Sequence, residues 1–139
     1  MLVVCHGNIC RSPLAGAVLS SRLGSERVRD CGLKTHPGQI CAKKIREYAD
    51  REGYDLSDHR ATQVTPGDVE WADIILFMDG GNYRRLQQLP GAEEKSCCLA
   101  SYIEQERLAD PAFISKGQKL EELLAQVVRA AEQAGRELC

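Results

Sequence analysis

The stretch LVVCHGNICRSP (residues 2–13) places a short apolar run, a tight loop and a helix-start signal next to one another. Leu2–Cys5 is typical of a β-strand, and the loop that follows contains a glycine and an asparagine. Ser12 before Pro13 predicts the beginning of a helix, with Ser12 as the N-cap and Pro13 at the first helical position, where its missing N–H is not needed. A strand that passes through a tight loop into a helix is the repeating unit of an α/β fold with a parallel sheet.

The rest of the chain alternates between strand and helix patterns in the same way. ADIILFM (residues 72–78) is a nearly continuous apolar run, as a central parallel strand covered on both faces requires. Further strands are expected at residues 27–33 and 95–100, and helices from Pro13 to about Leu23 with Gly24 ending it, from about Cys41 to Glu52, and from the Asp79-Gly80-Gly81 turn to Leu89. A last helix is predicted by an apolar stripe of Leu120, Leu123, Leu124, Val127, Val128 and Ala131. We therefore expect one α/β domain over residues 1–139, a three-layer sandwich with a four-stranded parallel sheet flanked by helices.

Composition excludes several classes of function. The 139 residues carry 18 basic and 20 acidic side chains, and a net charge of −2 offers no surface for nucleic acid or for an anionic membrane. The apolar run at residues 1–4 is far too short for a signal peptide, so we expect a cytoplasmic protein with no membrane contact. Seven cysteines, an odd number, then indicate free thiols in a reducing compartment rather than a disulfide framework.

The loop after the first strand has the chemistry of an anion site. Unpaired N–H groups of a tight loop and of the first helical turn converge with the positive end of the helix dipole behind them. Gly7 lets the backbone approach closely, Asn8 tolerates a left-handed conformation, and Arg11 can clamp two phosphate oxygens. A Cys5 thiolate at the base of this ring would be stabilised by the same groups and would lie in line with a leaving group, and Ser12 could donate a hydrogen bond to its sulfur.

Two other chemistries fit part of this loop. Cys5 and Cys10 have a spacing found in zinc half-sites, but no second pair complements them, because Cys97 and Cys98 are adjacent. We therefore expect no metal and no cofactor. The same two thiols also fit a redox pair, in which Cys10 captures Cys5 after peroxide has oxidised it and so protects it from irreversible oxidation.

The longer string VCHGNICRSP resembles the low-molecular-weight protein tyrosine phosphatases. The resemblance continues through SDHRATQVT (57–65), ADIILFMDGGN (72–82) and ADP (109–111), and so covers essentially the whole chain. It implies a phosphate-binding loop after the first strand, with Cys5 as nucleophile and Arg11 as phosphate clamp. It also implies that Asp110, followed by Pro111, is the general acid and base.

Further roles follow from matching positions. Asn8, Ser12 and His59 are expected to brace the loop, and the residues expected to contact substrate are His6, Gly7, Asn8, Ile9, Cys10 and Ser12. His36 and Phe113 are the candidates for contacting the substrate ring, because the chain has Ala112-Phe113 where the family usually has tyrosine after the proline, and a shortened loop at residues 34–40. The family's loop-supporting serine on the second strand corresponds to Cys31 in this interpretation.

The expected activity is hydrolysis of phosphotyrosine and other aryl phosphate monoesters through a phosphocysteine intermediate. Phosphoarginine hydrolysis is an alternative, although Ile9 stands where arginine phosphatases generally carry threonine. Thioredoxin-linked arsenate reduction needs two further cysteines after the third strand, and MDGGNYRRLQQ (78–88) contains none. A non-catalytic phosphate-binding adaptor is the remaining alternative. The expected partner is a phosphotyrosine-containing protein, with a tyrosine kinase among the candidates, and the expected state is a monomer or weak homodimer.

Overall fold

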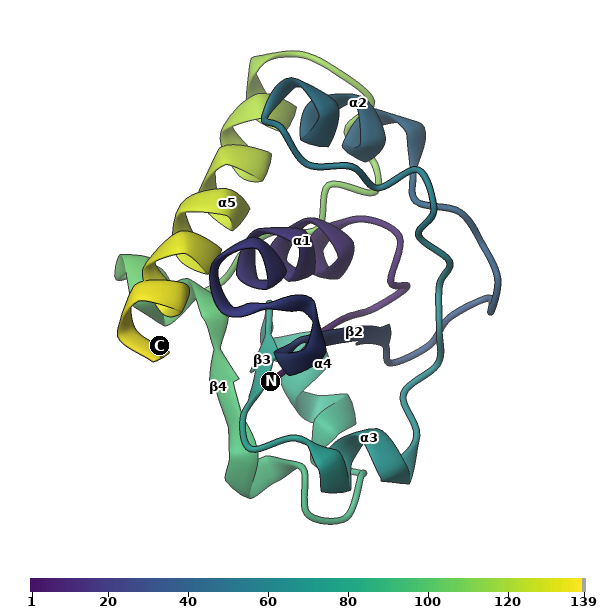
Figure 1. The fold of residues 1–139 in the computed structure, drawn as a ribbon, viewed down its shortest axis with the longest axis vertical. Helices are drawn as coiled ribbons and strands as arrows, with labels where there is room; N and C mark the ends of the chain where they lie inside the picture. Colours follow the sequence, from purple (N-terminus) through teal and green to yellow (C-terminus); the bar gives the residue numbers. More distant parts are fainter. Residues whose placement is uncertain (139) are drawn as a thin grey trace.

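The computed structural model describes residues 1–138, and within them the strands form one parallel sheet in the order β2-β1-β3-β4. The strands are β1 (Leu2–Cys5), β2 (Arg29–Gly32), β3 (Ile75–Phe77) and β4 (Ser96–Cys98). Each lies inside the segment in which a strand was expected, and the four-stranded parallel sheet is confirmed (Figure 1).

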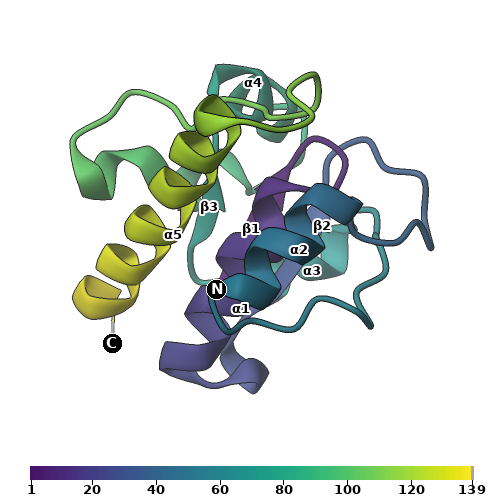
Figure 2. The same cartoon turned by 90° about the horizontal axis from the view of Figure 1, so that it is seen from above.

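Helices cover both faces of this sheet. Their bounds are α1 (Arg11–Leu23), α2 (Lys43–Arg51), α3 (Pro66–Trp71), α4 (Gly80–Leu86) and α5 (Gln118–Leu138), with short 3₁₀ segments at Ser25–Arg27, Glu93–Lys95 and Leu99–Ile103. Helices α1, α2 and α5 lie together on one side of the strands, and α3 and α4 lie on the other (Figures 1 and 2). No helix among residues 1–138 is long and apolar enough to span a lipid bilayer.

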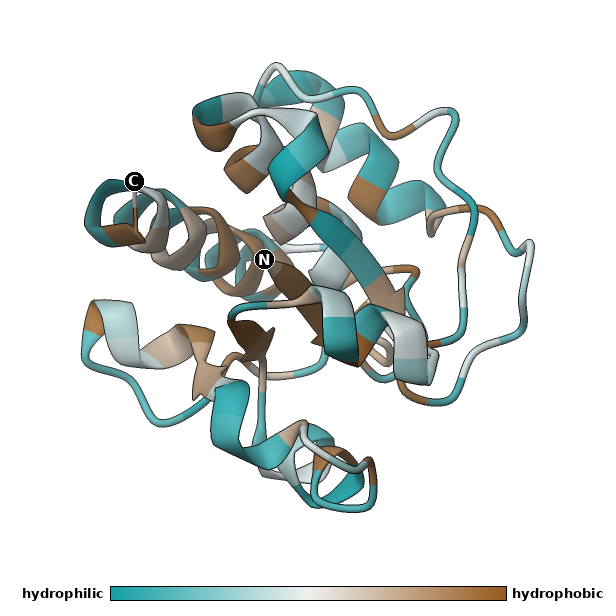
Figure 3. Cartoon of the chain, turned by 60° about the horizontal axis from the view of Figure 1, so that its bottom comes forward, coloured by the Kyte–Doolittle hydropathy of each residue, from teal (hydrophilic) through white to brown (hydrophobic). Residues whose placement is uncertain are grey.

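The central strand β1 shows why the sheet needs two helical layers. All four of its residues are buried, and they alternate between two cores. Val3 and Cys5 pack on the α1 and α5 side, whereas Leu2 and Val4 pack on the side of α3 and α4. Figure 3 shows the strongest hydrophobic colour on strands at the centre of the molecule, beside a strand that is teal over much of its length. A strand buried on both faces has no polar positions, which explains the unbroken apolar run in the sequence.

Two expectations about local structure were wrong. Helix α1 begins at Arg11 with Cys10 as N-cap, so Ser12 is inside the helix. Ser12 cannot cap because its hydroxyl is bonded to Cys5 and Asn8 instead. Helix α3 was not expected, yet Thr65 and Asp68 form a complete capping box at its start.

The topology brings two loops to one edge of the sheet. Strands β1 and β3 are parallel neighbours, so their carboxyl ends, at Cys5 and Phe77, lie at the same edge. The chain leaves β1 toward β2 on one side and reaches β3 on the other, which is the kind of crevice where open α/β sheets bind ligands.

Candidate active site

In the loop at residues 5–11, here the Cys5 loop, the carbonyl groups of Cys5, His6, Asn8 and Ile9 are paired, whereas the N–H groups of residues 6–10 are free in the described chain. The Cys5 and His6 carbonyls accept hydrogen bonds from Leu33 and Lys34 N–H groups at 2.9–3.1 Å, and the Ile9 carbonyl accepts one from the backbone of Ala42 at 2.9 Å. Within residues 1–138, no hydrogen bond uses the N–H groups of residues 6–10 as donors. Successive backbone N–H groups without an acceptor, in a curled loop whose carbonyls are held elsewhere, form a concave site for an anion.

Asn8 holds the Cys5 loop in its curled shape. Its φ of 59° is the left-handed conformation that was expected for an asparagine. The side chain is fully buried and donates from Nδ2 to the Ser12 hydroxyl at 2.8 Å and to Asp30 Oδ1 at 2.7 Å, while its Oδ1 accepts the Thr62 N–H at 2.9 Å. His59 Nε2 lies 2.7 Å from the Asn8 carbonyl oxygen. Asn8 therefore ties the loop to two segments far from it in sequence.

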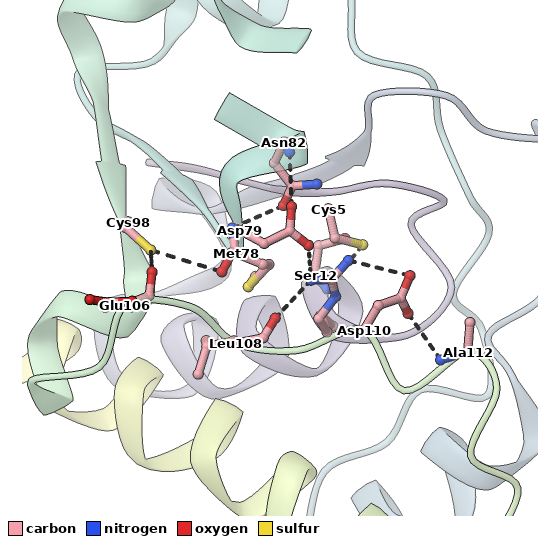
Figure 4. A network of polar contacts seen from close by, with 11 residues as sticks. Cys5, Ser12, Met78, Asp79, Asn82, Cys98, Glu106, Leu108, Asp110 and Ala112 are labelled. Carbon is pink, nitrogen blue, oxygen red and sulfur yellow. Dashed lines mark hydrogen bonds and ion pairs between the residues drawn. The ribbon is translucent and has the colours of Figure 1, made fainter. Parts of the chain in front are cut away.

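Cys5 is the last residue of β1, and its sulfur faces Ser12. The Sγ atom lies 3.0 Å from the Ser12 hydroxyl and accepts the Ser12 N–H at 3.4 Å (Figure 4). Asn8 Nδ2 donates to the oxygen of the Ser12 hydroxyl, so the hydrogen of that hydroxyl is available to be donated to a Cys5 thiolate, which can only accept. Cys5 is only 2% exposed, so the thiol lies buried at the floor of the loop.

The buried guanidinium of Arg11 connects the Cys5 loop to the end of β3. Arg11 is 2% exposed, and its Nη1 donates to Asp79 Oδ2 at 2.6 Å and to the Leu108 carbonyl at 2.8 Å. Burial alone would raise the pKa of Asp79, but the hydrogen bonds from Arg11 and from the Asn82 N–H hold that pKa below its usual value. Asp79 is thus an anion that holds the Arg11 guanidinium at the edge of the Cys5 loop.

The segment after Leu108 carries Asp110 to the same place. Arg11 Nη2 lies 3.6 Å from Asp110 Oδ2, and Figure 4 shows Asp110 on the same side of the sheet edge as Cys5 and Asp79. The start of this segment is fixed by the Leu108 N–H, which donates to the Met78 carbonyl at 2.8 Å. An exposed carboxyl beside a buried thiol and a cation is suited to proton transfer at a bound phosphate.

Lys44 of α2 holds the other end of the Asp110 segment. Its ammonium group donates to the carbonyl oxygens of Pro111 at 2.5 Å, Ala112 at 3.2 Å and Ile114 at 2.8 Å. Nothing in the sequence pattern indicated this clamp, because Lys44 lies in a highly charged helix, and such charged residues usually face solvent. The structure gives it three backbone partners on the segment that follows Asp110.

A cleft of about 780 Å³ opens over this centre. Its lining includes Arg11, Asp79 and Asp110, together with His6 and Phe113. His36 is exposed and is not part of this lining, and Phe113 is fully exposed at 101%. Gly7 and Ile9 lie in the Cys5 loop half-exposed, and Cys10 is 7% exposed beneath it.

The residue of β2 that supports the loop is Asp30, not Cys31. Alternation along the strand points Cys31 into the core on the opposite face, next to Val4, while Asp30 reaches Asn8 and lies 3.6 Å from His59 Nδ1. Burial raises the pKa of the Asp30 carboxyl, and the Asn8 hydrogen bond and His59 oppose that rise. Asp30 and Cys31 are neighbours on a strand and must therefore face opposite sides of the sheet, but a strand of four residues is too short for the sequence to show which side each one faces.

Gly32, at the end of β2, was also missed. A Cβ atom there would lie 2.1 Å from Thr35 Cγ2, 3.0 Å from the His6 carbonyl oxygen and 3.1 Å from Asn8 Cβ. Glycine is therefore required where β2 passes the Cys5 loop. No cluster of three or more potential metal ligands occurs in the part of the chain that is described.

A thiol at the floor of a ring of free N–H groups, with a buried arginine and a carboxyl beside it, is the arrangement of a cysteine-dependent phosphatase. The sequence matches the family described as low molecular weight phosphotyrosine protein phosphatase over residues 1–139. The probable low molecular weight protein-tyrosine-phosphatase EpsP of Ralstonia nicotianae is 36% identical over 132 residues, covering 95% of this chain and 90% of that protein. The chain belongs to the low molecular weight protein-tyrosine phosphatases.

Solved structures agree with this assignment at the level of the fold. The tyrosine phosphatase AmsI of Erwinia amylovora has a TM-score of 0.88 at 29% identity, covering 95% of this chain and 87% of that one. The YwlE arginine phosphatase of Geobacillus stearothermophilus has a TM-score of 0.87 at 23% identity, covering 99% and 90%. The second likeness shows a shared fold alone, so it does not decide between the two substrate classes.

Proposed function

We propose that the protein hydrolyses phosphotyrosine in proteins through a phosphocysteine intermediate, with Cys5 as nucleophile. The observation that carries this assignment is the backbone of the Cys5 loop, in which the N–H groups of residues 6–10 have no partner in residues 1–138 while the surrounding carbonyls are paired. Three phosphoryl oxygens accept hydrogen bonds from such a ring, and the Cys5 sulfur lies beneath it.

In the first step, the Cys5 thiolate attacks phosphorus and the P–O bond to the tyrosine breaks. Arg11 and the loop N–H groups stabilise the charge on the equatorial oxygens, and Asp110 gives its proton to the departing phenolate. The Ser12 hydroxyl, 3.0 Å from the sulfur, stabilises the thiolate before attack and again when sulfur leaves.

In the second step, the Asp110 carboxylate takes a proton from a water molecule, whose oxygen attacks phosphorus. The P–S bond breaks, inorganic phosphate is released and Cys5 returns to the thiolate. One carboxyl can serve both steps because the first leaves it ionised. Asp110 is suited to this because its Oδ1 is held by the Ala112 N–H at 3.0 Å, while the residue remains exposed to the cleft.

The nucleophile provides the direct test. Cys5→Ser should abolish turnover of p-nitrophenyl phosphate and of a phosphotyrosine peptide, while inorganic phosphate still binds, because the cradle is made of backbone and Arg11. A phosphoarginine peptide assayed beside them tests the alternative substrate, and faster turnover of that peptide than of phosphotyrosine would overturn the assignment. Full activity in the serine variant would rule out the covalent route, and phosphate binding without turnover by the wild type would indicate an adaptor.

A further inference from the structure

Helix α4 places two arginines on one wall of the cleft. Arg84 and Arg85 line the same cleft as Arg11 and Asp110, and both are exposed. Within residues 1–138, neither guanidinium forms an ion pair or a hydrogen bond through its side chain. The Arg84 guanidinium lies close to the first turn of α4, since a Cβ atom on Gly80 would be 3.5 Å from its Nη1. These two side chains are here called the arginine wall.

The charge of the arginine wall exceeds what phosphate binding requires. Arg11 already provides a buried cation at the Cys5 loop, and Asp79 pairs with it at 2.6 Å. The chain as a whole has a net charge of −2, so two unpaired cations beside the catalytic cleft are not part of a generally basic surface. Unpaired cations in a cleft raise the local concentration of anionic substrates and select among them.

The rest of the cleft lining offers little to a tyrosine ring. Among the described residues that line the cleft, the aromatic side chains are His6 and Phe113, and Phe113 is fully exposed. A site with few ring contacts needs another source of discrimination between phosphotyrosine segments. Arg84 and Arg85 line the same cleft as Arg11 and Asp110, so a charged group beside the phosphotyrosine would come within their reach.

We propose that Arg84 and Arg85 bind a second acidic group of the substrate, next to the phosphotyrosine that is hydrolysed. The chemistry they recognise is an anionic oxygen group, either a carboxylate or a second phosphate, to which arginine binds through two parallel N–H donors. The preferred substrates are therefore acidic phosphotyrosine segments. This specificity rests on the proposed function, because it concerns the same cleft and the same reaction.

The test compares kcat/KM for matched phosphotyrosine peptides. One carries glutamate beside the phosphotyrosine, a second carries another phosphotyrosine there, a third carries glutamine, and a fourth carries lysine. We expect the wild type to prefer the first two over the glutamine peptide by about 3- to 30-fold, as expected for one or two solvent-exposed ion pairs, and to prefer them less at high salt. A preference for only the glutamate peptide, or for only the peptide with two phosphotyrosines, would show whether the arginine wall recognises a carboxylate or a phosphate.

The variant Arg84→Glu/Arg85→Glu should abolish or reverse this preference, and Arg84→Gln/Arg85→Gln should remove it without reversal. Arg129→Glu, at an exposed position of α5, is the control for a change in net charge and should retain the wild-type ratio. Equal rates for glutamate and glutamine peptides in the wild type, or an unchanged ratio in both double variants, would overturn the role of the arginine wall. Failure of the proposed function is distinguishable, because the wild type would then hydrolyse none of the four peptides.

Discussion

The Lys44 clamp leads to a specific prediction about the Asp110 segment. Lys44→Met keeps the length of the side chain and removes the ammonium group that donates to the carbonyls of Pro111, Ala112 and Ile114. The fold should tolerate this change, because the Leu108 end of the segment retains its hydrogen bonds to Met78 and Arg11. The expected effect is a less restricted Asp110, and therefore slower protonation of the leaving group.

The magnitude follows from the contacts. A hydrogen bond that involves a charged group contributes about 1.5–3 kcal/mol. The three carbonyls share one ammonium group, and the exposed Ala112 carbonyl can bind water once Lys44 is gone, so we take the loss of a single charged hydrogen bond as a lower bound for the clamp. A loss of about 1.5–3 kcal/mol lowers the ratio of ordered to disordered segment roughly 10- to 150-fold, which is the largest possible fall in the population of the ordered segment. General-acid catalysis is worth about 10²–10⁴-fold, which sets the upper limit for the effect on kcat.

The assay is a series of aryl phosphates that differ in the basicity of the leaving phenolate. We expect kcat of Lys44→Met to fall about tenfold or more for alkylphenyl phosphates and far less for esters with good leaving groups, which need little protonation. Lys43→Met is the matched control, because Lys43 is the preceding residue of α2, its side chain is 80% exposed and its ion pair is with Glu47 at 3.8 Å. Equal losses across the series, or the same profile in both variants, would refute a positioning role for Lys44.

The remaining predictions concern the acid, the second thiol and the buried ion pair. Asp110→Asn should slow alkylphenyl phosphates by about 10²–10⁴-fold and good leaving groups much less, as measured by the same series. We expect peroxide to convert the Cys5 thiolate to a sulfenic acid, and the Cys10 thiol then to displace water and form a disulfide. The wild type should therefore recover activity in dithiothreitol and Cys10→Ser should not, whereas equal recovery would mean that Cys10 only packs against the loop. Burial, and next Cys5, raise the pKa of Cys10 to about 11, so it stays a neutral thiol in the resting enzyme. Asp79→Asn should lower the free energy of unfolding at pH 7 by about 1–3 kcal/mol, because it removes the carboxylate 2.6 Å from the buried Arg11 guanidinium and leaves only Asp110, at 3.6 Å. Because the folded-state pKa of Asp79 is lowered, its contribution to stability is present above about pH 4 and is lost as the pH falls through the folded-state pKa. The free energies of unfolding of the wild type and of Asp79→Asn, measured by urea titration, should therefore converge below that folded-state pKa.

The sequence was sufficient for the sheet and for the position of the Cys5 loop because both depend on local patterns. An apolar run, a left-handed asparagine and a proline near the helix start all act within a few residues of one another. The same local reasoning failed at Ser12, whose hydroxyl is bonded to Cys5 and Asn8 rather than to its own helix. It also failed at α3, which has six residues and no apolar periodicity, although its capping box could have been recognised.

The residues that could not be predicted act over long sequence separations. Asp30 contacts Asn8 from β2, and the direction of its side chain depends on which face of a four-residue strand lies toward α1. Lys44 reaches carbonyls 67–70 residues away, and nothing near it in the sequence indicates that partner. Phe113 and His36 were chosen as the aromatic rings in the two segments where the family has aromatic residues, and of the two only Phe113 lines the cleft.

In the Cys5 loop, a rigid backbone and protection of the amides from hydrogen exchange, which usually occur together, are separated by the pattern of hydrogen bonds. Its carbonyls are fixed to Leu33, Lys34 and Ala42, so the loop is held in one shape, yet the amides of residues 6–10 have no acceptor in residues 1–138. These amides should therefore exchange with solvent deuterium quickly although the segment is rigid, unlike the amides of the buried strand β1 directly before it. Bound phosphate or vanadate supplies the missing acceptors and should slow exchange at these five positions without any change of backbone conformation.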